Sequence, residues 1–135
     1  MSAKVFLDTN VLIYALDAAA PHKQQRAKEL LADEDWVISW QIIQEFSNVA
    51  LHRFTVPMTT PDLAHYLELV LWPRCAVFPS PAIYRAALAI QQQTQYRFYD
   101  SLVVASALAS GAQRLYSEDL QAGRLVGPLT IQNPF

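Results

Sequence analysis

Short apolar segments alternate with longer amphipathic segments along the chain, and this alternation constrains the fold more than any other feature. A continuous apolar run predicts a strand buried on both faces, whereas apolar residues at i, i+3, i+4 and i+7 predict a helix. The predicted strands cover residues 3–7, 36–38, 75–78, 114–117 and 129–131, and the predicted helices cover 11–16, 22–32, 42–54, 60–70, 81–95 and 99–110. This order indicates the α/β class, as a three-layer α/β/α sandwich around a short, mainly parallel sheet.

Length and composition limit what such a sandwich can be. With 135 residues, 53% of them hydrophobic and 16% charged, the sequence predicts one packed domain over residues 1–135. No apolar run approaches the roughly 20 residues that cross a bilayer, and the first residues lack the pattern of a signal peptide. The lone Cys75 cannot form an internal disulfide and suits a reducing compartment. We therefore expect a cytoplasmic protein that does not enter a membrane.

Residues with strong positional preferences mark several element ends. Asp8-Thr9-Asn10 follows the first strand as a group of cap and turn residues. Thr60 is expected to cap a helix whose first residue is Pro61. Gly111 is expected to act as the C-terminal cap of the small-residue helix before it.

Four acidic residues lie where the predicted elements begin or end. Asp8 follows the first strand, and Asp119 lies just past the strand that ends at Ser117. Asp100 occupies the first turn of an otherwise nearly apolar helix, and Glu45 lies at the edge of an inward-facing apolar stripe. Because ligands bind outside the carboxyl ends of the strands in open parallel sheets, the four side chains are expected to converge at one rim of the sheet.

Converging carboxylates need cations, because like charges in a partly dehydrated cleft raise one another's pKa. Hard oxygen ligands select hard ions, so Mg²⁺ or Mn²⁺ is the expected cofactor. Such an ion suits phosphodiester hydrolysis, since it lowers the pKa of a water molecule and stabilises the leaving oxygen. A net charge of -2 does not by itself favour a nucleic-acid partner. Bound cations, however, add positive charge that a count of side chains omits.

Each acid taken singly also has an ordinary structural explanation. Asp8 could cap the helix after it, and Asp100 at a helix start is favoured by the helix dipole whatever the function. Asp119 could be a turn residue, and Glu45 an exposed helix position. Only the shared location of the four favours a site.

Four short motifs occur in order along nearly the whole chain. They are Phe6-Leu7-Asp8-Thr9-Asn10, Gln44-Glu45-Phe46, Tyr99-Asp100-Ser101-Leu102 and Leu115-Tyr116-Ser117-Glu118-Asp119-Leu120. In this order and spacing they resemble the PIN-domain family and, within it, the VapC-type ribonuclease toxins of bacterial toxin–antitoxin pairs. The resemblance implies a PIN-like α/β/α domain with Mg²⁺- or Mn²⁺-dependent endoribonuclease activity.

The resemblance also implies roles for individual residues and partners. The positions that match the family's catalytic and metal-binding acids are Asp8, Glu45, Asp100 and Asp119. Asn10 and Ser117 match supporting polar positions, which hold metal-bound water or orient a carboxylate. Glu118 should point away if Asp119 points into the site. The implied partners are an RNA substrate, a small cognate antitoxin and a second copy of the chain in a homodimer.

The remaining polar residues predict less. Three histidines lack the spacing of metal ligands, and three basic residues favour solvated helix faces over contacts with RNA phosphates. The first set is His22, His52 and His65, and the second is Lys23, Arg26 and Arg53.

Three other functions compete with a toxin. A haloacid-dehalogenase-like phosphatase also places an aspartate after its first strand, but it needs a second acid two residues on, where this chain has Asn10. A solitary RNA-processing nuclease would have the same acids without an antitoxin. A nonenzymatic RNA- or protein-binding module of the same fold is disfavoured by the presence of all four acids.

Overall fold

The computed structural model describes residues 3–120 and 122–135. Its strands are β1 (Lys4–Leu7), β2 (Asp35–Ser39), β3 (Cys75–Val77), β4 (Arg114–Tyr116), β5 (Leu125–Val126) and β6 (Leu129–Gln132). Its α-helices are α1 (Thr9–Leu16), α2 (Pro21–Asp33), α3 (Trp40–His52), α4 (Thr60–Tyr66), α5 (Pro81–Thr94) and α6 (Phe98–Ala109). A π-helical segment, η1 (Leu67–Leu71), and a 3₁₀ turn, η2 (Trp72–Arg74), continue from α4.

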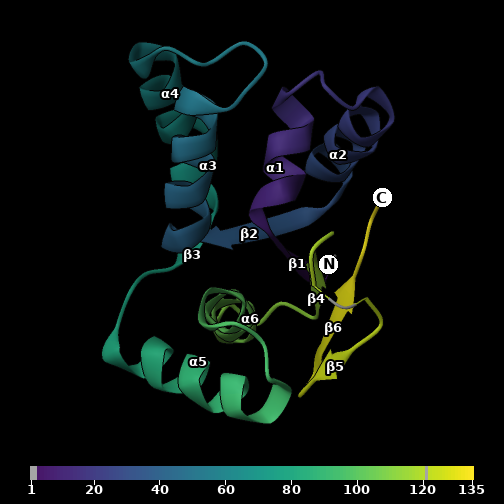
Figure 1. Ribbon diagram of the computed structural model, residues 1–135, viewed down its shortest axis with the longest axis vertical. Coiled ribbons are helices and arrows are strands. Elements are labelled where there is room, and N and C mark those ends of the chain that lie inside the picture. Colours follow the sequence, from purple (N-terminus) through teal and green to yellow (C-terminus); the bar gives the residue numbers. More distant parts are fainter. Residues whose placement is uncertain (1–2, 121) are drawn as a thin grey trace.

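The strands form one sheet in the order β3-β2-β1-β4-β6-β5. All neighbouring pairs are parallel except β5 and β6, which are antiparallel. Helices α1, α2, α3 and α4 cover one face of the sheet and α5 and α6 cover the other, with α6 next to the sheet (Figure 1). The predicted α/β/α sandwich around a mainly parallel sheet is therefore confirmed.

Strand β1 lies inside the sheet, between β2 and β4, and sets the position of the catalytic candidates. Val5, Phe6 and Leu7 have no exposed surface, as expected for a strand with helices on both faces. Leu7 pairs with Tyr116 at the carboxyl ends of β1 and β4. The backbone N–H of Asp8 then donates to the Tyr116 carbonyl at 2.9 Å. Both strands consequently end at the same edge of the sheet.

Helix α6 is buried around its whole circumference. Every residue from Ser101 to Ala107 is buried, because the helix lies between the sheet and α5. Its small side chains permit this close packing, as the sequence predicts. Gly111 follows the helix with φ +80°, a left-handed conformation that glycine adopts without a steric cost. The predicted stop signal is confirmed.

Several element ends differ from the expectations, and one strand was not predicted. The side chain of Thr59, and not that of Thr60, caps α4 by accepting from the Asp62 N–H. Helix α5 ends one residue earlier than predicted, because Gln95 takes the left-handed conformation with φ 65°. The short antiparallel strand β5 is missing from the prediction, since two residues carry too little periodic pattern to identify a strand.

None of the helices formed by residues 3–120 and 122–135 is long and apolar enough to cross a bilayer.

Candidate active site

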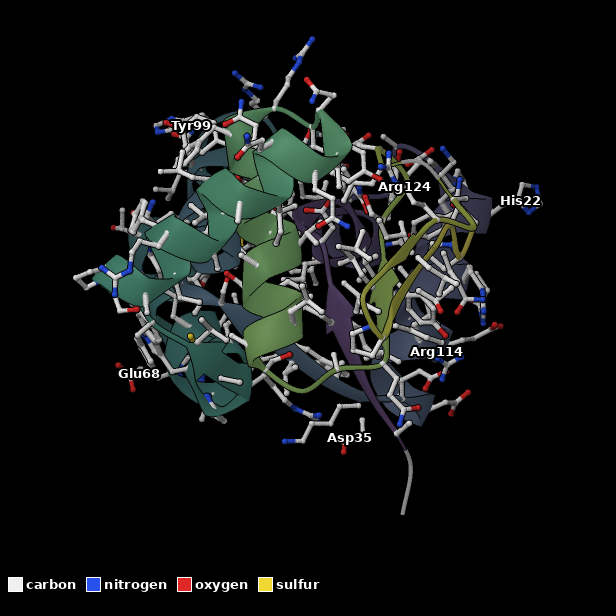
Figure 2. All side chains as sticks on the ribbon, turned by 90° about the horizontal axis from the view of Figure 1, so that it is seen from below. His22, Asp35, Glu68, Tyr99, Arg114 and Arg124 are labelled. Atoms are coloured by element: carbon white, nitrogen blue, oxygen red, sulfur yellow. The ribbon has the colours of Figure 1, made fainter. Side chains whose placement is uncertain are left out.

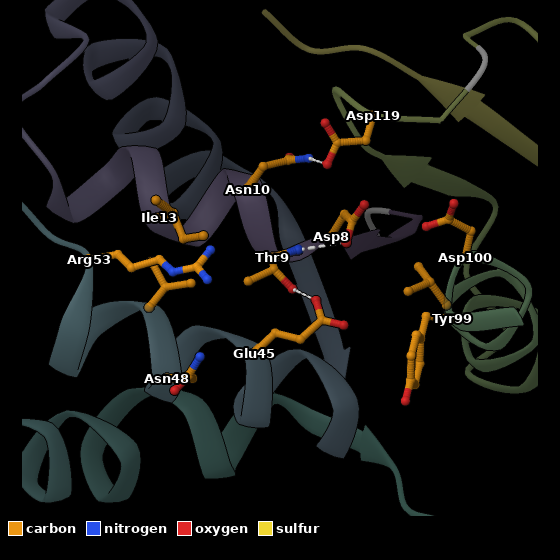
Figure 3. Close-up of a pocket in the computed structure, with 12 residues that line it drawn as sticks. Asp8, Thr9, Asn10, Ile13, Glu45, Asn48, Arg53, Tyr99, Asp100 and Asp119 are labelled. Carbon is orange, nitrogen blue, oxygen red and sulfur yellow. Dashed lines mark hydrogen bonds between the residues drawn. The ribbon is translucent and has the colours of Figure 1, made fainter. Parts of the chain in front are cut away.

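A cavity of about 350 Å³ opens at the carboxyl edge of the sheet. Side chains from the β1–α1 junction, α3, α6 and the loop after β4 line it (Figure 3). The structure brings all four predicted acids to this cavity: Asp8, Glu45, Asp100 and Asp119. Figure 3 shows them on different walls, with Glu45 opposite Asp100 and Asp119.

Asp8 is the most buried of the four acids, with 7% of its surface exposed. One carboxylate oxygen accepts from the Thr9 N–H at 2.8 Å, so Asp8 also caps α1. The other oxygen accepts from the Ser117 hydroxyl at 2.7 Å. Burial raises the pKa of Asp8 to about 6, the two hydrogen bonds oppose this rise, and the charges of Glu45 and Asp119 add to it. Asp8 therefore both caps α1 and lines the cavity.

Ser117 links Asp8 to the loop that carries Asp119. Its buried hydroxyl oxygen accepts from the Asp119 and Leu120 N–H groups, both at 3.2 Å, while it donates to Asp8. The sequence-based expectation that Ser117 orients a carboxylate agrees with this geometry.

Replacing Ser117 with alanine is expected to raise the pKa of Asp8 further, because the lost hydrogen bond favours the ionised form. Two backbone N–H groups also lose an acceptor, so the free energy of unfolding should fall by about 1–3 kcal/mol. Carboxyl ¹³C NMR titration and chemical denaturation of the metal-free protein measure the two effects. Ser110→Ala, which removes a hydroxyl that donates to the Ala107 carbonyl at 2.7 Å, is the matched control. An unchanged Asp8 pKa in Ser117→Ala would contradict the orienting role.

Two hydrogen bonds fix the side chain of Glu45 on α3. The Thr9 hydroxyl donates to one carboxylate oxygen at 2.6 Å, and the Gln41 amide donates to the other at 3.3 Å. The same Gln41 amide donates to the Tyr99 carbonyl at 3.1 Å, which connects α3 to the start of α6. Glu45 thus faces the cavity in one defined orientation and is more than an exposed helix residue.

Asp100 and Asp119 form the opposite wall. Partial burial, followed by the charge of Asp119, raises the pKa of Asp100 against the opposing effect of Arg97. The Asn10 amide donates to Asp119 at 3.2 Å, so this second supporting residue also orients an acid. The side-chain amide oxygen of Asn10 (Oδ1) is buried and has no hydrogen-bond partner among the described residues. Such an oxygen is available to a cation or to its bound water.

Glu118 has a different function from its neighbour Asp119. Its carboxylate forms an ion pair with Lys23 on α2, and Lys23 also donates to the Tyr14 hydroxyl at 3.3 Å. This contact lowers the pKa of Glu118. The side chain therefore anchors the loop after β4 to the helical layer, which agrees with the expectation that it points away from the acids.

The donor set fits a divalent cation, although the acids do not form a compact ligand cluster. Within residues 3–120 and 122–135, no group of three or more His, Cys, Asp or Glu side chains is close enough to hold a metal ion as placed. The cavity nevertheless collects four carboxylates and an unpartnered amide oxygen, which are the hard donors that Mg²⁺ and Mn²⁺ prefer. Burial is the main cause of the raised pKa values of Asp8 and Asp100, and the charges of neighbouring acids add to it, so a bound cation would favour the ionised carboxylates.

Sequence reasoning assigned no site role to several residues that line or support the cavity. Thr9 and Gln41 orient Glu45, and the exposed Arg53 lines the cavity instead of only facing solvent. The spacing of Gln41 and Glu45, four residues apart on a helix, is a signal that could have found the pair. No local pattern marks Arg53, because its place depends on how α3 packs against α1.

The architecture and the site together define a parallel α/β domain with an acidic pocket at the carboxyl edge of its sheet. The PIN-domain family model matches residues 5–126, and the chain therefore belongs to the PIN-domain family. No curated protein sequence matches the chain significantly.

Several solved toxin structures have a similar fold. The toxin–antitoxin complex from Klebsiella pneumoniae is 17% identical, with a TM-score of 0.70 over 97% of this chain and 98% of that chain. VapC20 of Mycobacterium tuberculosis, described as a sarcin-ricin-loop-cleaving toxin, is 19% identical, with a TM-score of 0.64 over 85% and 89%. VapBC2 from Rickettsia felis, bound to a promoter DNA fragment, is 15% identical, with a TM-score of 0.63 over 96% and 98%. At these identities the likeness concerns the fold alone.

Proposed function

We propose that this protein is a Mg²⁺- or Mn²⁺-dependent endoribonuclease and the toxin of a toxin–antitoxin pair. One observation carries the enzymatic part: four acids from separate parts of the chain line one cavity at the carboxyl edge of the sheet. The PIN family model and the toxin titles of structures with this fold support the choice of RNA and of an antitoxin partner. Dimer formation by two copies remains part of the proposal.

The side chains that line the cavity would have distinct roles in this reaction. Asp8, Glu45, Asp100 and Asp119 would hold the ion, with Ser117 and Asn10 orienting two of them. When bound, the ion supplies positive charge at the scissile phosphate and lowers the pKa of a water molecule. Glu45 is held by Thr9 and Gln41 and would accept a proton from the attacking water.

Arg53 would bind a phosphate of the RNA. Its guanidinium group extends from the end of α3 toward the centre of the cavity (Figure 3) and forms no ion pair with any described residue. It is the one basic side chain among the residues that line this cavity. A cation in this place would offset the repulsion between the carboxylates and the RNA backbone.

Replacing Arg53 with alanine is therefore expected to raise KM by about 10- to 100-fold, the value of a charge-assisted hydrogen bond, and to leave kcat within a few-fold. Initial rates over a range of RNA concentrations separate the two parameters. Arg85→Ala on α5, an exposed arginine on the other helical layer, is the matched control and should change neither. A fall in kcat at constant KM would assign Arg53 a different function.

Incubation with an RNA panel tests the activity itself. The purified protein should cleave RNA with Mg²⁺ or Mn²⁺ and lose this activity in excess chelator. Cleavage that survives the chelator would exclude the metal-dependent mechanism. The toxin assignment predicts that the protein copurifies with a small protein encoded by a neighbouring gene. It also predicts that the complex no longer cleaves RNA. Activity without such a partner would favour a solitary RNA-processing nuclease.

A further inference from the structure

A second cavity of about 330 Å³ adjoins the acidic one. We call it the base subsite, and it is lined by Gln41, Gln44, Glu45, Asn48 and Tyr99. Glu45, Asn48 and Tyr99 line both cavities, so a molecule in one lies directly beside a molecule in the other. Its size falls in the range of small-molecule sites.

One wall of the base subsite presents amide groups. Gln44 and Asn48 are exposed and lie four residues apart on α3, so their side chains project from the same face of the helix. Each amide offers both hydrogen-bond donors and an acceptor. The amide nitrogen of the buried Gln41 donates to Glu45 and to the Tyr99 carbonyl, while its amide oxygen has no hydrogen-bond partner among the described residues. This wall can pair with the mixed donor and acceptor edge of a nucleobase.

The other wall is the ring of Tyr99, which is 70% exposed. It lies across the cavity mouth from Glu45 and Asn48 (Figure 3). Phe98 contacts it edge to face, with a centroid distance of 5.8 Å, and Phe98 in turn stacks on Tyr84 at 6.1 Å. Neighbouring aromatic rings support the position of Tyr99 while one of its sides remains open. Figure 2 shows Tyr99 at the surface of the molecule.

The charge of the base subsite argues against a phosphate as its occupant. None of the five lining residues is basic, and Glu45 carries a negative charge. A neutral, flat, hydrogen-bonding ring satisfies both walls, because bases stack on aromatic side chains and pair with amides.

We propose that the base subsite binds one unpaired nucleobase of the RNA, beside the phosphate that is cleaved in the acidic cavity. The base stacks on Tyr99 and directs its edge to Gln44 and Asn48. Stacking on Tyr99 requires that this base is unpaired, because a base held in a duplex cannot present its face to a side chain. This inference rests on the proposed function, because it names a base-binding subsite of the same site.

Binding measurements on an Asp100→Asn background, chosen to suppress cleavage, test the proposal. The probes are fluorescent oligoadenylate, oligocytidylate, oligouridylate and an abasic ribose-phosphate chain of the same length. Replacing Tyr99 with leucine should weaken binding of at least one base-containing probe by about tenfold, the loss expected for one stacked base. The affinity for the abasic chain should not change. Tyr99→Phe retains the ring and should bind as the parent does.

Further variants distinguish recognition from general damage. The double variant Gln44→Ala/Asn48→Ala should reduce the difference in affinity among the three base-containing probes. Phe78→Leu removes an exposed aromatic ring outside the subsite and should have no effect. Equal weakening of the abasic and base-containing probes by Tyr99→Leu would overturn the proposal. A changed molecular mass of that variant in solution would also overturn it, by assigning Tyr99 to an interface between copies.

The readout separates this inference from the proposed function. Absence of RNA cleavage by the wild-type protein, with base-dependent binding intact, would refute the nuclease and retain the subsite. Cleavage without base-dependent binding would refute the subsite and retain the nuclease.

Discussion

Replacing Asp100 with asparagine is expected to lower kcat/KM for RNA cleavage by about a thousandfold, since a bound cation contributes several kcal/mol to stabilising the transition state. Asp100 faces the cavity from the first turn of α6, next to Asp119. Asparagine has the same size but lacks the charge that would hold the ion. Initial rates measured at RNA concentrations well below KM, over a range of Mn²⁺ concentrations, test this directly.

The fold should tolerate this substitution, which makes the activity measurement interpretable. Removing the charge relieves repulsion by Asp119, while the helix loses a favourable dipole interaction of about 0.3–1 kcal/mol. Glu68→Gln neutralises an exposed carboxylate in η1, away from the cavity, and should leave kcat/KM unchanged. Calorimetric titration of Mn²⁺ should show weaker binding to Asp100→Asn. Activity of Asp100→Asn within a few-fold of wild type would show that Asp100 does not hold the ion and only favours the start of α6.

Replacing Asp8 with asparagine is expected to stabilise the metal-free protein at neutral pH. Burial raises the pKa of Asp8 from 3.8 to about 6, so the ionised carboxylate is unfavourable in the folded state. At about 1.36 kcal/mol per pKa unit, the cost above the folded pKa is on the order of 3 kcal/mol. This cost decreases as the pH falls from 6 to 4. In that range Asp8 is protonated in the folded protein but still ionised in the unfolded chain.

Denaturation of wild type and Asp8→Asn in chelator, at several pH values, measures this effect. The excess stability of the variant should be largest above the folded pKa and should vanish below the unfolded pKa. Part of the gain will be offset, because asparagine replaces an acceptor of the Ser117 hydroxyl. Added Mn²⁺ should stabilise wild type and not the variant, since ligands stabilise the state that binds them. A variant that is less stable at every pH would show that the two hydrogen bonds outweigh the charge.

The architecture could be predicted because its signals are local. Val5, Phe6 and Leu7 form an apolar run that predicts a strand covered on both faces, and the central position of β1 agrees with this prediction. Strand β5 could not be predicted in this way. Its two residues pair through a turn at Gly127, and their pattern is too short to separate from a loop.

The acids could be placed at one rim because strand ends and helix starts have fixed positions in a parallel sheet. Their support could be predicted only in part. Ser117 and Asn10 were identified, but the hydrogen bond from Thr9 to Glu45 joins residues 36 positions apart and depends on how α1 packs against α3. Tyr99 has the sequence signature of an ordinary helix residue, and only the three-dimensional structure places its exposed ring beside the cavity.

The hydrogen bond between Ser117 and Asp8 spans 109 residues of sequence, and it has a consequence for biosynthesis. The ribosome releases Asp8 well before Ser117 and Asp119, which follow β4. The acidic cavity can therefore form only after β4 has paired with β1. Folding of the N-terminal helices alone does not create it.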